Sequence, residues 1–186
     1  DVYCVLAPRS QGIMDQIPPD LGNDIRYLNR EELTSGLIKS VLRFHDSHKT
    51  ADGLMAKDAI NPFALKHFLP YLTISEFHED PFRLRYRLVG TEVVRFVRRD
   101  FTGVWLHESG WPDDIIALNL ALYHHVYATR RPLFGLSTVD WDGRSSYRFE
   151  WAVLPLSTDG LKATHCLGID DYSQIASKPP IPLRPE

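Results

Sequence analysis

Two histidine-containing pairs are the residues that first suggest chemistry. His124 and His125 are neighbours in a predicted helix, where adjacent side chains point about 100° apart, so they cannot bind one metal ion from the same face. His165 and Cys166 are neighbours in a predicted strand and point to opposite faces, which excludes a catalytic Cys–His pair formed by these two. A contact between Cys166 and His124 across the core stays open as an alternative. No C-x-x-C motif or ligand-spaced cluster occurs, and no metal site is predicted.

Known catalytic motifs are absent from the sequence. There is no Gly-rich phosphate loop, no G-x-S-x-G elbow and no pair of carboxylates with suggestive spacing. We interpret Asp113-Asp114 as the start of a helix and Asp170-Asp171 as the end of a strand. The sequence therefore predicts no catalytic residue and a protein that is not an enzyme.

Aromatic and polar side chains of the predicted helix and strands could line a small-molecule pocket. Such pockets combine aromatic walls with a few convergent polar groups. The candidate ligand-binding residues are Tyr86, Trp105, Asn119, Tyr123, Tyr127 and Trp151. The same side chains would also form an ordinary core, so both interpretations stay open.

Arginines alternate with apolar residues in the first strand after residue 81. Arg83, Arg85 and Arg87 point away from the apolar positions and, with Arg148, form a candidate interface on the outer sheet face. The alternative is pairing across the sheet with Glu76 and Glu150 on neighbouring strands.

The elements that must position these residues follow from apolar periodicity, caps and turns. Helices are expected at 31–48, after Asn61-Pro62, after Thr91 and at 111–130, and strands at 71–78, 82–89, 133–141, 146–156 and 163–170. The first helix is amphipathic and leads the domain. Asn119 falls within the apolar arc of the long helix and needs an interior partner.

The organisation along the chain has four parts. We expect an irregular arm at 1–30 with a short strand at 2–6, a helix and connector at 31–57, a main domain at 58–173 and a Pro-rich tail at 174–186. A net charge of −3 gives no reason to expect nucleic acid, and no apolar run approaches the roughly 20 residues of a membrane helix. Two distant cysteines favour a reducing, cytoplasmic location.

Three stretches resemble one family. F-A-L-K-H-F-L-P-Y-L at 63–72, F-R-L-R-Y-R-L-V-G-T at 82–91 and R-D-F-T-G-V-W-L at 99–106 are similar to single-domain PAS-like proteins common in alphaproteobacteria, over about 58–172. The resemblance implies an α+β fold, with a five-stranded antiparallel sheet and central helices on one face. It also implies a small ligand or cofactor between sheet and helices, and pairing through the outer sheet face and the leading helix.

The resemblance can be tested against the cofactors known in this family. Flavin-binding members carry a cysteine in the region comparable to 93–100, which has none here, and haem-binding members carry a histidine near the position of Asn119. We therefore expect neither flavin nor haem, and leave the cofactor unknown. The predicted function is a non-enzymatic regulatory or sensory protein that binds a small molecule or partner protein and signals through homodimer or partner contacts. The alternatives are a small α+β cone-type enzyme, such as an isomerase or dehydratase, and a ligand-free interaction module.

Overall fold

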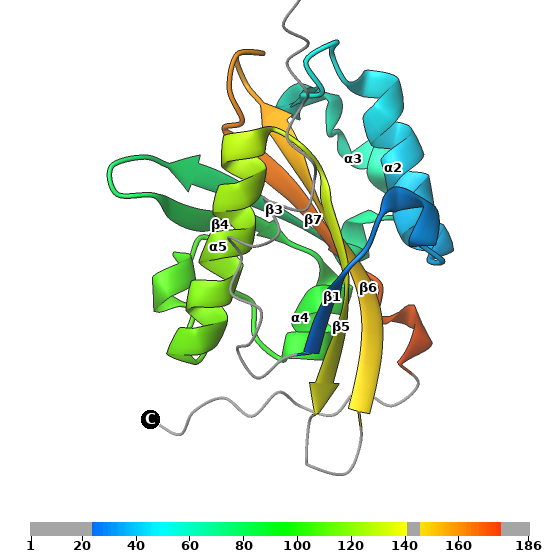
Figure 1. The fold of residues 1–186 in the computed structure, drawn as a ribbon, viewed down its shortest axis with the longest axis vertical. Helices are drawn as coiled ribbons and strands as arrows, with labels where there is room; N and C mark the ends of the chain where they lie inside the picture. Colours follow the sequence, from blue (N-terminus) through cyan, green and yellow to red (C-terminus); the bar gives the residue numbers. More distant parts are fainter. Residues whose placement is uncertain (1–23, 141–145, 176–186) are drawn as a thin grey trace, which may run out of the picture.

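One mostly antiparallel sheet forms the centre of the molecule, seen in a computed structural model that describes residues 24–140 and 146–175 (Figure 1). Its strands are β1 (Asp24–Tyr27), β2 (Met55–Ala56), β3 (Leu72–His78), β4 (Arg83–Val89), β5 (Leu133–Asp140), β6 (Ser146–Ser157) and β7 (His165–Asp170). The spatial order is β1-β5-β6-β7-β3-β4, and β2 pairs in parallel with the end of β6. The fold is therefore α+β, as predicted.

The sheet has more strands than the five predicted. β1 lies within the segment expected to be irregular and pairs antiparallel with β5, and the connector contributes β2. In β1 the apolar Ile25 and Tyr27 alternate with Arg26, but four residues are too few for this period to stand out in the sequence. The predicted strand at 2–6 lies outside the described residues.

The helices α4 (Thr91–Val97) and α5 (Asp113–Thr129) cover one face of the sheet. Leu118, Leu122 and Val126 of α5 pack into a core cluster with residues of β3, β4, β6 and β7. The helix expected after Thr91 is α4, which begins at Thr91 itself and has Gly90 as its N-cap. We call this cluster the α5-side core.

The opposite face is covered by α2 (Gly36–His48) and α3 (Pro62–Leu65), which together with strand residues form a second core cluster. The first helix was expected from residue 31, but it begins at Gly36 because the Ser35 hydroxyl caps it by accepting a hydrogen bond from the Ile38 amide. Short 3-10 helices lie at Arg30–Glu32, Lys57–Ala59, Leu69–Tyr71, Leu106–Glu108 and Tyr172–Gln174. Helices thus lie on both sides of the sheet, in two layers that β6 and β7 separate (Figure 1).

Candidate functional site

The end of β7 places a carboxylate on the aromatic face of the α5-side core. Asp170 is the last residue of β7 and stands opposite Trp151 of β6 in the strand register. Paired residues of an antiparallel sheet share a face, and alternate residues of one strand do too, so Asp170 shares a face with Trp151 and with Cys166. Both of those side chains belong to the α5-side core.

The chain beyond β7 folds back so that a second polar group reaches Asp170. Asp171 caps the short 3-10 helix at Tyr172–Gln174, where its Oδ1 accepts a hydrogen bond from the Ser173 amide at 3.0 Å. This turn buries Tyr172, whose hydroxyl lies near enough to Asp170 to lower its pKa. The Tyr172 ring stacks on Phe96 of α4, with centroids 3.8 Å apart and planes 11° from parallel.

The electrostatic setting of Asp170 is unusual for a carboxyl. Among the described residues no basic side chain forms an ion pair with it. Burial raises the pKa of Asp170 to about 6, and the hydrogen bond with Tyr172 acts in the opposite direction. The residue nevertheless remains partly accessible. It can therefore gain or lose a proton, or meet a cation, close to neutral pH.

Two more phenols complete this interior cluster. Tyr86 of β4 and Tyr123 of α5 are buried, and each influences the pKa of the other. Burial raises the pKa of both phenols, and the charge of Asp170 raises it further. The Tyr123 hydroxyl lies above Gly168 of β7, where a Cβ would come within 3.8 Å of it. We call Asp170, Tyr172, Tyr86 and Tyr123 the acid–phenol cluster.

The structure brings together only part of the predicted ligand-binding set. Tyr86, Tyr123 and Trp151 are buried in the α5-side core, and the Trp151 Nε1 donates a hydrogen bond to the Ser137 hydroxyl at 2.9 Å. Tyr127 lies near the other end of the same core, where its hydroxyl donates to Glu79 at 2.9 Å.

Two predicted ligand-binding residues lie elsewhere. The side-chain amide of Asn119 donates a hydrogen bond to the Ile115 carbonyl at 2.8 Å. The partner that Asn119 needed is therefore a backbone carbonyl of the same helix. Trp105 pairs with Arg85 in an isolated bridge and lies under two guanidinium groups, 4.6 Å from Arg83 and 5.6 Å from Arg85. It therefore shares a face with the arginines and not with Tyr86.

The four predicted interface arginines do not form one surface. Arg83, Arg85 and Arg87 lie on β4, and Arg87 forms an ion pair with Glu76 of β3 at 3.4 Å. Arg148 lies on β6, three strands away in the sheet order. The predicted cross-strand pairing is thus present for Glu76. Glu150 instead binds the chain before α2.

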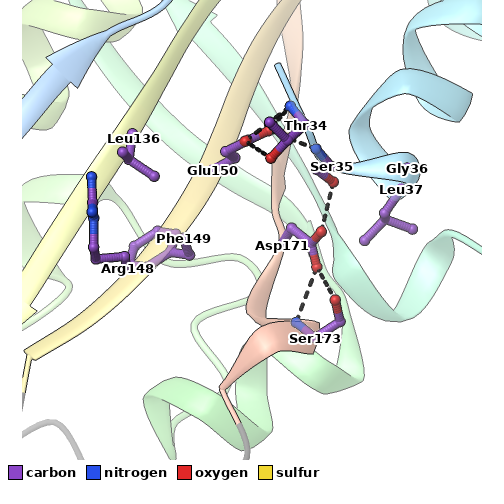
Figure 2. A pocket seen from close by; sticks show the side chains of 10 residues that line it. All are labelled: Thr34, Ser35, Gly36, Leu37, Leu136, Arg148, Phe149, Glu150, Asp171 and Ser173. Carbon is purple, nitrogen blue, oxygen red and sulfur yellow. Dashed lines mark hydrogen bonds between the residues drawn. The ribbon is translucent and has the colours of Figure 1, made fainter. Parts of the chain in front are cut away.

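A groove of about 310 Å³ opens between the start of α2, β6 and the end of β7 (Figure 2). It is lined by Thr34, Ser35, Gly36, Leu37, Leu136, Arg148, Phe149, Glu150, Asp171 and Ser173.

The Glu150 carboxylate accepts hydrogen bonds from the Thr34 and Ser35 amides at 2.9 to 3.0 Å and from the Thr34 hydroxyl. Asp171 accepts one from the Ser35 hydroxyl at 2.6 Å. These two carboxylates anchor α2 to the sheet. We call Thr34, Ser35, Glu150 and Asp171 the α2 anchor.

The histidines do not assemble a metal or catalytic site. His124 is exposed on α5 and packs against Phe82, whereas Cys166 is fully buried, so the two do not pair. In the described part of the chain no three His, Cys, Asp or Glu side chains are grouped to hold a metal ion.

Sequence reasoning missed Asp170, although a signal for it was present. Cys166 lies in the last predicted strand and is buried in the structure, and strand alternation from it places Gly168 and then Asp170 on the same face. Because Asp170-Asp171 was interpreted as the end of a strand, the alternation was not followed as far as Asp170.

Comparison with known proteins identifies no family for this chain. The chain matches no model of a known protein family, and a search of curated proteins finds no similar sequence. Within 24–140 and 146–175, no helix combines the length and the apolar character needed to cross a membrane. Function must therefore be argued from the geometry of the site.

Proposed function

We propose that this chain is a non-enzymatic regulatory protein of PAS-like fold, which binds a small molecule beside the acid–phenol cluster and signals through α2. The order β3, β4, α4, α5, β5, β6, β7 supports it, because the resemblance predicts this succession of two strands, helices and three strands. The antiparallel β3–β4 hairpin next to β7 agrees with the same succession. A cytoplasmic location belongs to the proposal and agrees with the free thiol of Cys166.

The observation that carries the proposal is the adjacency of Asp170 and Asp171. Asp170 belongs to the acid–phenol cluster on the α5 side, and Asp171 holds Ser35 at the start of α2 on the other side. A ligand that shifts the backbone at Asp170 or Tyr172 therefore also shifts the peptide that carries Asp171. The resulting shift at Ser35 would change the packing of α2 and so its contacts with a second copy or a partner.

Native mass spectrometry of the protein purified from its own host tests ligand binding. We expect extra mass on the native chain that is lost on denaturation, and that is absent from Asp170→Asn. The control is Asp58→Asn, which removes the same charge at an exposed position and should keep the extra mass. A wild-type chain without extra mass, and without a change in hydrogen exchange over 36–48 when host extract is added, would refute the proposal.

One observation favours a second candidate function, the cone-type enzyme. Such an enzyme needs a buried carboxyl of raised pKa beside a His or Tyr, and Asp170 with Tyr172 provides that pair. The two functions differ in what happens to the bound molecule. A sensor returns it with unchanged mass after incubation with fresh protein, whereas an enzyme converts it to a product of different mass or retention time.

The ligand-free interaction module rests on the β4 arginines. Arg83 and Arg85 are stacked on Trp105, which holds their charges in place for an acidic partner. If this is the function, Arg85→Ala with Arg87→Ala abolishes association. The double variant also loses the hydrogen bond of Arg85 to the Gly103 carbonyl and the Arg87–Glu76 ion pair, so its melting temperature should fall slightly, and association is measured well below that temperature. Arg95→Ala, an exposed arginine of α4, is the matched control and should not affect association.

A further inference from the structure

α2 carries a histidine on the side that packs against the sheet. Ile38, Leu42 and His45 are spaced by four and three residues, so they lie along one stripe of the helix, and all three are buried. His45 is only 1% exposed. Histidine is the side chain that gains a charge just below neutral pH, so its place between helix and sheet makes this contact sensitive to acid.

The hydrogen bond of His45 determines where a proton can be added. Its Nε2 lies 3.3 Å from the Pro155 carbonyl of β6. A carbonyl oxygen can only accept, so Nε2 carries the hydrogen and Nδ1 carries the lone pair. Nδ1 is buried and makes no hydrogen bond with the described residues. A second proton must therefore be added at Nδ1, inside the contact between α2 and β6.

The carboxylate beside Nδ1 is already paired with two cations. Asp46 Oδ1 lies 3.9 Å from Nδ1, which is beyond hydrogen-bonding distance. The same oxygen accepts a hydrogen bond from Lys49 at 2.8 Å, and Oδ2 accepts one from Arg30. A positive charge on His45 would thus be a third cation beside one carboxylate, almost without access to solvent. Because a buried charge is stable only where it is paired and hydrogen-bonded, the charged ring favours a position in water.

We propose that protonation of His45 releases the last turns of α2 from the sheet, so that α2 is a pH-sensitive switch. Release lets the charged ring reach water and uncovers apolar residues of the second core cluster, such as Leu154 and Leu156 of β6. The α2 anchor lies at the other end of the helix, about ten residues or 15 Å from His45, and is not part of the switch. This inference goes beyond the proposed function, because the switch needs no ligand.

The groups that face His45 determine the direction of the pH effect. They are Asp46 and Lys49 of α2 and the end of it, Arg30 of the preceding 3-10 helix and the Pro155 carbonyl of β6, whereas β2 has no titratable side chain. Burial lowers the pKa of His45, with smaller contributions from Lys49 and Arg30, while the Pro155 carbonyl and Asp46 act in the opposite direction. The folded contact therefore binds a proton less readily than the released helix, and acid favours release.

The size of the effect follows from the released helix, in which the ring has its ordinary pKa of 6.5. Its protonated fraction there rises from about one tenth at pH 7.5 to about nine tenths at pH 5.5. As long as the folded contact keeps the ring neutral, the equilibrium constant for release rises by up to about tenfold between these two pH values.

Hydrogen exchange of the full chain, followed by NMR at pH 7.5 and pH 5.5, tests the inference. Protection, the ratio of the intrinsic to the measured exchange rate, should fall by about three- to tenfold over 42–48 and should not fall in β7. His45→Gln keeps a donor for the Pro155 carbonyl but cannot be protonated, so its protection over 42–48 should not fall with pH. His67→Gln removes an exposed histidine and should behave like wild type.

Two results overturn the inference. One is protection over 42–48 that does not fall in wild type, and the other is an equal fall in His45→Gln. If His45→Gln has lost this protection already at pH 7.5, nitrogen NMR of the wild-type ring decides. An Nε2–H ring whose titration coincides with the fall in protection supports the switch, and a fall without titration of the ring refutes it. Ligand binding in native mass spectrometry is a separate result, so a failed switch leaves the proposed function standing.

Discussion

Replacing Asp170 by Asn should make this protein more stable at neutral pH. The carboxyl has a pKa of about 6 in the folded chain, against 3.8 as the ordinary value. The folded state thus holds its proton more tightly than the unfolded state. Between pH 4 and pH 6 it binds more protons than the unfolded chain does, so the free energy of unfolding falls as pH rises through this window.

The magnitude follows from the size of the pKa difference. A difference of about 2 units at about 1.4 kcal/mol per unit corresponds to roughly 3 kcal/mol between pH 4 and pH 7.5. Asn keeps the size of the side chain and an acceptor for the Tyr172 hydroxyl but has no proton to lose. The stability advantage of Asp170→Asn over wild type should therefore grow by about 3 kcal/mol over this range, or roughly 6–12 °C in melting temperature.

Urea unfolding followed by tryptophan fluorescence at pH 4, 5, 6 and 7.5 measures this difference. The comparison between variant and wild type is needed because other groups also titrate. His45, for example, is buried and has its pKa lowered by burial, so its contribution to stability falls as the solution becomes acidic. Asp58→Asn provides the charge control. Parallel pH profiles for Asp170→Asn and wild type would refute the reasoning.

Three further predictions concern other parts of the structure. Glu150→Gln removes the charged acceptor of the α2 anchor, so it should lower the free energy of unfolding by about 2 kcal/mol and speed hydrogen exchange over 36–48. The exposed Glu108→Gln is the control. Unchanged hydrogen exchange in Glu150→Gln would contradict the anchor. Gly90→Ala would push a methyl group into the Leu69 carbonyl and should cost about 1–3 kcal/mol in urea unfolding. Cys166 is fully buried and burial raises the pKa of its thiol, so in a Cys4→Ser background iodoacetamide should label it only at the rate of unfolding; labelling as fast as a free cysteine would disprove this.

The long periodic elements were predictable from the sequence, and the short ones were not. α5 and the alternating strand β4 show their periods over 17 and 7 residues. β1 and β2 have 4 and 2 residues, and they exist because β5 and β6 offer them backbone partners distant in sequence. Such partners leave no local pattern.

The site was predictable only where a residue lies within a regular strand or helix. Tyr86 and Trp151 were expected in the core because strand alternation continues through them. Trp105 follows a turn, after which the period no longer tells which face it takes. Glu150 was expected to pair with an arginine, but its partners are backbone amides 115 and 116 residues away, and amides carry no sequence signal.

The two ends of α2 are fixed by different contacts. Its first turn is held through Glu150 and Asp171, which accept hydrogen bonds from Ser35. Its last turn is held by the hydrogen bond between the His45 ring and the Pro155 carbonyl of β6, at 3.3 Å, and by the ion pair of Asp46 with Arg30. Thirteen residues make a rod of about 20 Å, which is thus fastened near both ends. A displacement at Asp171 is therefore carried along the whole rod instead of tilting it about one end, and a partner on the exposed side of α2 would sense it at any point of the helix.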